Sequence, residues 1–197
     1  KGMFGLHAAF TLSDKTLEKA SKLGNGLNTG FHVHVAEGES DEEFNVKNFG
    51  MRVAERLDKF KILGNKSLAI HCVHINENEM DILAKNGTAV VHNPQSNLNN
   101  AVGIADIIKM KEKGILVGLG TDAMTVKMPE ELRVALWAQH IRNSNPTCGF
   151  MEVANTLLNN NRKIAARYWN IPLGTIEENA AADIVLIDYY PPTPLDE

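Results

Sequence analysis

The chain has 197 residues, of which 44% are hydrophobic and 22% are charged, and it carries a formal net charge of -4. This composition is typical of a globular protein, and the length suffices for one sizeable core or for one domain plus part of another. The negative charge and the lack of any Lys/Arg cluster argue against nucleic acid or an acidic membrane surface as a partner.

The first two apolar runs both carry histidine. Residues 3–10 predict a strand that contains His7 and leads into a helix. In residues 31–35, phenylalanine and valine alternate with His32 and His34, so both imidazoles leave one face of a pleated strand. His32 is open to two interpretations, as a chelating partner of His34 or as an occluded, hydrogen-bonded imidazole.

Glu37 follows the second strand, where a loop runs into a helix. Ser40 and Glu43 are spaced as a capping box, and apolar residues recur at helical spacing through residues 41–59. A carboxylate at the end of a strand, beside an imidazole on that strand, suits a proton shuttle near a metal ion. This pattern predicts an acid/base role for Glu37.

Three further apolar runs end in polar residues. Residues 67–74 predict a buried strand that reaches histidine at its end. Residues 88–91 lead into a polar loop that begins at His92. Residues 115–119 lead to Asp122.

Helices are predicted between and after these runs. Asn76 and Pro129 occupy helix-start positions, and residues 150–169 predict a further helix. Residues 182–188 then predict a last strand.

Short strands separated by helices predict an α/β fold with a parallel sheet, because parallel strands need crossover connections. In a (β/α) barrel the carboxyl ends of the strands form one mouth, where catalysis is built. The ligand-type residues in or at the ends of the predicted strands are His7, His34, Glu37, His71, His92 and Asp122. The periodicity alone leaves a barrel and an open, doubly wound sheet as alternatives.

Imidazole and carboxylate groups are the ligands of a hydrolytic divalent metal ion, which makes a water molecule acidic enough to attack near neutral pH. A single strand-end histidine is more often a hydrogen-bonded core or surface residue, and Asp122 has the alternative role of a helix cap or turn former. The conjunction of such residues at several strand ends favours a site.

Four motifs occur in a fixed order along the chain. They are HVAE at 34–37, AIHCVH at 69–74, HNPQSNL at 92–98 and LGTD at 119–122. This series resembles the amidohydrolase superfamily, in the branch of methylthioadenosine, adenosylhomocysteine and guanine deaminases and triazine chlorohydrolases. The resemblance implies a partial TIM-type (β/α) barrel at residues 1–172, about strands 4 to 8, and a return to a small β-sandwich domain at residues 173–197.

By position, the resemblance implies that His34, His71 and Asp122 are metal ligands. Glu37 and Asp122 are then the catalytic residues, as acid/base and as proton acceptor. The implied cofactor is one divalent metal ion, with zinc as the first choice and iron or manganese as alternatives. Residues on the substrate side are implied as well: His7, His92, Asn93, Ser96 and Asn97.

The resemblance also implies a longer protein. The family begins its barrel with a His-x-His pair, and nothing before His7 supplies one. His32-Val-His34 matches the His-x-His pattern, but its position relative to His71 corresponds to the fifth strand of the family's barrel, not the first. A complete barrel takes ~250 residues, so we expect this chain to be the C-terminal half or so of an enzyme.

The expected activity is hydrolysis of a non-peptide C–N bond, by deamination of a heterocyclic amine as the small-molecule substrate. The alternative is a non-catalytic metal-binding or selenium-pathway accessory protein with a decayed site. Cys72 and Cys148 form neither a disulfide framework nor a zinc motif, which predicts a reducing cytoplasm. No apolar run approaches the roughly 20 residues of a membrane helix. Assembly into a homo-oligomer is left open.

Overall fold

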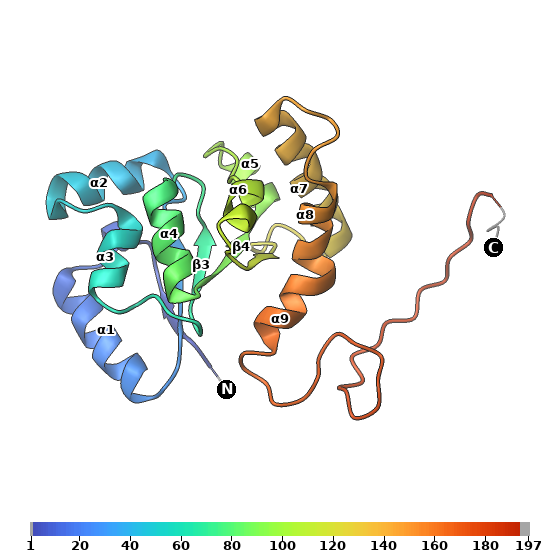
Figure 1. The fold of residues 1–197 in the computed structure, drawn as a ribbon, viewed down its shortest axis with the longest axis horizontal. Helices are drawn as coiled ribbons and strands as arrows, with labels where there is room; N and C mark the ends of the chain where they lie inside the picture. The colour runs from blue at the N-terminus through green and yellow to red at the C-terminus, as the bar shows by residue number, and fades with distance from the viewer. Residues whose placement is uncertain (1, 194–197) are drawn as a thin grey trace.

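The computed structural model describes residues 2–193 and contains one parallel sheet, shown in Figure 1. Its strands are β1 (Phe4–Leu6), β2 (Phe31–Val35), β3 (Leu68–His71), β4 (Ala89–His92) and β5 (Val117–Leu119). They are hydrogen-bonded in the order β1-β2-β3-β4-β5, and every adjacent pair is parallel. A doubly wound sheet reverses its strand order, whereas a barrel adds each strand beside the previous one. The strand order therefore matches part of a (β/α) barrel.

Helices form the connections between the strands. The α-helices are α1 (Asp14–Gly26), α2 (Glu39–Phe49), α3 (Val53–Lys59), α4 (Glu77–Asn86), α5 (Pro94–Asn99), α6 (Ile107–Glu112), α7 (Met128–Asn143), α8 (Phe150–Asn155) and α9 (Asn161–Ala165). A 3-10 turn, η1 (Ala9–Thr11), precedes α1, and a π-helical turn, η2 (Thr156–Asn160), joins α8 to α9. Among residues 2–193, no helix has both the length and the apolar composition needed to cross a membrane.

The alternation predicted for β2 is present. Phe31, Val33 and Val35 are buried in the hydrophobic core, while His32 is exposed and His34 is half-buried. One face of the strand therefore packs against apolar residues, and the other presents imidazoles.

A buried arginine ties the first helices together. Arg56 on α3 is fully buried, and its guanidinium donates to Asp14 at the start of α1 and to Asn45 on α2. The same group lies 3.5 Å above the ring of Phe49. Such a charge is stable inside a core only because its donors are paired.

The helix predicted at residues 41–59 is two helices. Gly50 ends α2 with φ 66°, a left-handed conformation that glycine adopts without strain. The predicted capping box of Ser40 and Glu43 is wrong, because α2 begins at Glu39, two residues before the predicted start, and its N-cap is Gly38. Asp41 caps the helix instead.

The cap at α2 also shapes the loop after β2. Asp41 Oδ2 accepts hydrogen bonds from the backbone N–H groups of Glu37 and Gly38. The start of α2 is therefore fixed to the residue that the sequence predicts to be the acid/base.

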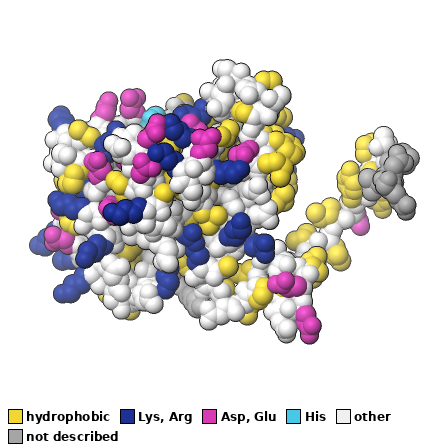
Figure 2. Space-filling view, viewed as in Figure 1, with side chains coloured by type: hydrophobic (Ala, Val, Ile, Leu, Met, Phe, Trp, Pro, Cys, Tyr) yellow, Lys and Arg dark blue, Asp and Glu magenta, His cyan; other side chains and the backbone are white. Residues whose placement is uncertain are grey.

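The predicted strand at residues 182–188 is also wrong. These residues lie in an extended segment that leaves the body of the molecule in Figure 1, and they pair with no strand among residues 2–193. Hydrophobic side chains line this segment in Figure 2. The assignment of residues 173–197 to a second domain stays a prediction, and residues 194–197 of it lie outside the described part of the chain.

Candidate metal centre

The carboxyl ends of β1, β2 and β3 bring histidines side by side. The rings of His34 on β2 and His71 at the end of β3 are stacked, with centroids 5.4 Å apart. His7 follows β1, and its ring centroid is also 5.4 Å from that of His34. His32 is exposed, with its centroid 6.1 Å from that of His34, so it is not an occluded imidazole.

Two carboxylates face the same imidazole. His71 Nε2 lies 3.6 Å from Glu37 Oε2 and 3.9 Å from Asp122 Oδ2. Glu37 follows β2, and Asp122 follows β5. The structure thus brings together His34, Glu37, His71 and Asp122 from the ends of three strands.

The hydrogen bond on the other side of the ring sets the tautomer of His71. His71 Nδ1 is 2.8 Å from Asn97 Oδ1, and both residues are buried. With the Asn97 amide oriented so that its oxygen faces the ring, Nδ1 carries the hydrogen, because an amide oxygen only accepts, and a neutral ring then has its lone pair on Nε2. That lone pair faces two carboxylates, and these acceptors repel one another unless a cation or a proton lies between them.

His34 is suited to remain neutral. Burial, followed by the charges of neighbouring histidines, lowers the pKa of His34 below its ordinary value. Its buried Nδ1 has no hydrogen-bond partner among residues 2–193. A neutral imidazole with a free nitrogen has the chemistry of a metal ligand.

His92 ends β4 and is fully buried, and neither of its ring nitrogens has a partner within the described chain. Burial, with a smaller contribution from His71, lowers the pKa of His92 to about 4. Asn93 is also buried, and a Cβ at Gly120 would collide with its Oδ1. Glycine at position 120 therefore allows β5 to approach this residue closely.

The predicted polar loop after β4 is the short helix α5. Pro94 occupies its first turn, where a missing N–H costs nothing. Ser96 Oγ donates to Asp122 Oδ2 at 2.6 Å, and Asn100, the C-cap of α5, donates to Glu37 Oε1 at 3.1 Å. Sequence reasoning missed Asn100. Its position four residues after Ser96 would have placed the two on one helix face, had these residues been predicted as helical.

The donor types fit a divalent cation, but the set is incomplete. Imidazole nitrogen and carboxylate oxygen are zinc ligands. A positive charge would suit the unpartnered Nδ1 of His34, and it would also relieve the repulsion between His71 Nε2 and the two carboxylates near it. As placed, however, no three His, Cys, Asp or Glu side chains within residues 2–193 could by themselves hold a metal ion. The described residues offer part of a coordination sphere.

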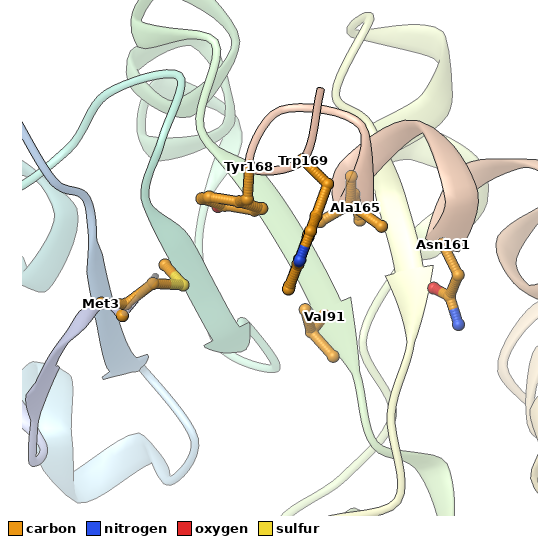
Figure 3. A pocket seen from close by; sticks show the side chains of 8 residues that line it. Met3, Val91, Asn161, Ala165, Tyr168 and Trp169 are labelled. Carbon is orange, nitrogen blue, oxygen red and sulfur yellow. The ribbon is translucent and has the colours of Figure 1, made fainter. Parts of the chain in front are cut away.

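A separate apolar pocket of about 280 Å³ contains none of the predicted site residues. Figure 3 shows Tyr168 and Trp169, which follow α9, facing Val91 on β4 and Met3 at the start of the chain. Tyr168 is fixed there by a hydrogen bond from its hydroxyl to the carbonyl oxygen of Lys66.

Known proteins resemble this chain in sequence. A 5'-deoxyadenosine deaminase from Methanopyrus kandleri is 32% identical over 188 residues, which are 93% of this chain and 43% of that protein. A 5-methylthioadenosine/S-adenosylhomocysteine deaminase from Dictyoglomus thermophilum is 34% identical over 195 residues, or 96% and 45% of the two chains. The chain thus spans less than half the length of these relatives.

Solved structures resemble it in fold. An adenosine deaminase from Xanthomonas campestris with bound zinc matches with a TM-score of 0.76 and 25% identity, over 84% of this chain and 38% of that one. E. coli guanine deaminase matches with a TM-score of 0.74 and 20% identity, over 83% and 40%. The model of the Amidohydrolase family matches residues 1–197. The chain therefore belongs to the amidohydrolase family.

Proposed function

We propose that the protein in its full-length form hydrolyses a C–N bond and deaminates a heterocyclic amine. The observation that carries this proposal is the convergence of Glu37 and Asp122 on His71 Nε2, at 3.6 and 3.9 Å, beside His34. The names of the sequence relatives favour aminopurine nucleosides as the first substrates to test.

We propose that His34, His71 and Asp122 contribute to holding one divalent metal ion, with zinc preferred over iron and manganese. When bound, such an ion supplies a water molecule that is acidic near neutral pH. Membership of the amidohydrolase family and the bound zinc of the Xanthomonas protein support this assignment.

The carboxylates have distinct proposed roles in the reaction. Asp122 accepts a proton from the attacking water, and Glu37 delivers a proton to the ring nitrogen of the substrate. Water adds to the ring carbon that carries the amino group, and Asp122 then passes its proton to that amino group. The C–N bond breaks, ammonia leaves, and Glu37 recovers a proton from the new hydroxyl group as the carbonyl forms. Asn100 fixes Glu37 through Oε1, which leaves Oε2 turned toward His71.

The remaining expectations stay proposals as well. His7, His92, Asn93, Ser96 and Asn97 belong to the substrate side in this proposal, although all but His7 are buried. A cytoplasmic location and a small-molecule substrate complete it.

The test is ammonia release from a panel of aminopurine nucleosides by the zinc-loaded, full-length protein. Glu37→Gln should lower turnover by about 10²–10⁴-fold and leave zinc content unchanged, because this carboxylate moves a proton. Glu39→Gln, an exposed position on the same segment, is the matched control. Full turnover by Glu37→Gln would remove Glu37 from the mechanism.

A second measurement separates the roles of the histidines. His34→Gln and His71→Gln should both lower zinc content, measured by elemental analysis after dialysis. Full zinc content in His71→Gln would remove His71 from the ligands and leave it a proton carrier beside Glu37.

The alternative is a metal-binding protein without turnover. The unpartnered Nδ1 of His34, beside His71, suits a metal site of this kind as well. Zinc binding with no ammonia release from any substrate would support this alternative against the deaminase.

A further inference from the structure

We infer that α5, together with its C-cap Asn100, is a positioning element that aligns three groups of the metal centre at once. Its side chains reach residues that follow or end three different strands: Glu37 after β2, His71 on β3 and Asp122 after β5. This inference rests on the proposed function, since it takes these three residues as the reacting and ligating groups. It gives Ser96 and Asn97 a positioning role in place of contact with substrate.

The helical period places the three contacts on one side of α5. Asn100 lies four residues after Ser96 and three after Asn97, and residues at these spacings share a helix face. Ser96 and Asn97 are buried, whereas Leu98, Asn99 and Asn100 are exposed, so Asn100 reaches Glu37 at the solvent-exposed rim of the site. The inward face of this helix is therefore polar, unlike the apolar inward face of an ordinary barrel helix.

Contacts with its neighbours hold α5 in place. Pro94 is buried where the helix leaves β4, and the Gln95 N–H donates to Glu131 Oε2 on α7. At the other end, the Val102 N–H donates to the Asn97 carbonyl oxygen, and the Val102 carbonyl oxygen accepts a hydrogen bond from His74 Nε2, in the loop after β3. A helix anchored at both ends can orient the groups that it contacts.

Asn97 has the most specific task. Its Oδ1 accepts from His71 Nδ1–H at 2.8 Å, which leaves the lone pair on Nε2 turned toward the two carboxylates. Without this acceptor the hydrogen can move to Nε2, where Glu37 and Asp122 attract it. The tautomer of His71 is thus controlled from α5.

Ser96 and Asn100 orient the carboxylates. The Ser96 hydroxyl donates to Asp122 Oδ2, the oxygen nearer to His71. Asn100 Nδ2 donates to Glu37 Oε1 and leaves Oε2 facing His71. Side chains of this kind, which contact ligands without touching the metal, typically change metal affinity by 10–100-fold.

The first test reads the tautomer directly in the metal-free, ¹⁵N-labelled full-length protein, from long-range ¹H–¹⁵N correlations of the imidazoles, at a pH at which the ring nitrogens report a neutral His71. We expect His71, assigned by loss of its signals in His71→Gln, to carry its hydrogen on Nδ1. Asn97→Leu should shift the signals toward the Nε2–H form, while Leu98→Ala, at an exposed position of α5, should not. An Nε2–H tautomer in the unmodified chain, or no change in a folded Asn97→Leu, overturns the inference.

The second test uses the full-length protein and zinc alone, in competition with a chromophoric chelator. Ser96→Ala should weaken zinc binding by about 10-fold or more, since it releases a proposed ligand. Asn100→Ala should leave zinc affinity unchanged, because Glu37 is not a ligand, but it should lower turnover. Equal zinc affinity in Ser96→Ala and the unmodified chain contradicts the positioning role. Neither the tautomer nor zinc affinity depends on ammonia release, so failure of the deaminase proposal remains distinguishable.

Discussion

At the residue scale, the backbone around the centre is strained. Non-glycine residues hold left-handed conformations at Ala36 (φ 46°), His71 (φ 70°), Cys72 (φ 53°), Asp122 (φ 46°) and Ala123 (φ 59°). Each costs roughly 1–2 kcal/mol, because Cβ approaches a carbonyl oxygen. This strain is concentrated at the ends of β2, β3 and β5, where the side chains of His71 and Asp122 approach each other.

Ala123 allows this strain to be measured, because the residue is exposed. Ala123→Gly should raise the free energy of unfolding by about 1 kcal/mol, since glycine adopts φ 59° without a Cβ clash. The measurement is urea denaturation followed by circular dichroism. Ala166→Gly is the matched control and should lower stability, because Ala166, the exposed C-cap of α9, has a right-handed conformation with φ -59°, in which glycine gains nothing and loses more conformational entropy on folding. A loss of stability in Ala123→Gly would contradict the presence of strain.

His92 predicts a pH dependence of the metal-free chain. Burial lowers its pKa from the ordinary 6.5 to about 4, so the unfolded chain binds a proton between these values while the folded chain does not. The stabilising contribution is complete above pH 6.5 and is lost as the pH falls toward 4, by about 3 kcal/mol at most. His92→Leu should therefore show a smaller loss of stability over this range in urea titrations. Equal losses would place His92 in contact with solvent.

At the element scale, a buried acidic pair joins α2 to α4. Glu42 on α2 and Glu79 on α4 are both buried, and the Arg52 guanidinium bridges them at 3.3 and 2.7 Å. Burial and the Glu79 carboxylate raise the pKa of Glu42 to about 8, from an ordinary 4.5. At neutral pH, one proton is therefore bound to this pair of carboxyl groups.

This pair predicts a loss of stability in alkali. A raised pKa in the folded chain stabilises fully below pH 4.5, and the contribution is lost as the pH rises through about 8. Glu42→Gln, which does not titrate, should reduce the fall in unfolding free energy between pH 5 and 9. Glu43→Gln, exposed on the same helix, should keep the fall of the unmodified chain. An unchanged slope in Glu42→Gln would mean that Glu42 is ionised throughout.

The elements differ in how far the sequence predicts them. The apolar runs that became β2, β3 and β4 carry their own pattern, and Asn76 caps α4 as predicted, because a capping side chain bonds to its own neighbours. The strand at residues 182–188 was predicted from local composition alone. A strand also needs a hydrogen-bonded neighbour, and the local pattern carries no information about that.

The site shows the same division. Ligand-type residues at strand ends indicate convergence because parallel strands point the same way, and the predicted group of His34, Glu37, His71 and Asp122 does converge. Their supporting contacts could not be predicted, because α5 is too short for a helical period to be recognised. The contact of Asn100 with Glu37 joins residues 63 positions apart, and only the fold reveals it.

At the scale of the whole molecule, an incomplete barrel leaves strand edges without a neighbouring strand. Side chains cover the outer edge of β5: Asn161 bonds to both the N–H and the carbonyl oxygen of Leu119, and Asn160 donates to the carbonyl oxygen of Val117. These amides imitate the pairing that a further strand would provide. The edge of β5 is therefore covered at Val117 and Leu119, which precede Asp122 in the chain.

The extended C-terminal segment has no such protection. Val185, Leu186 and Ile187 are 81%, 94% and 78% exposed, and their backbone pairs with no strand among residues 2–193. A run of exposed apolar side chains on an unpaired backbone is a template for association with another chain. We expect the 197-residue chain to self-associate, with a sedimentation coefficient that rises with protein concentration.

Substitutions in this segment test the cause of association. Val185→Lys combined with Ile187→Lys should abolish the concentration dependence, because two charges oppose both apolar burial and strand pairing. Asn48→Lys combined with Asn170→Lys adds the same charge at exposed positions outside the segment and should leave association unchanged. If both double variants behave alike, net charge and not the exposed segment controls association. A concentration-independent coefficient in the unmodified chain would instead mean that the segment's apolar side chains are covered within the monomer.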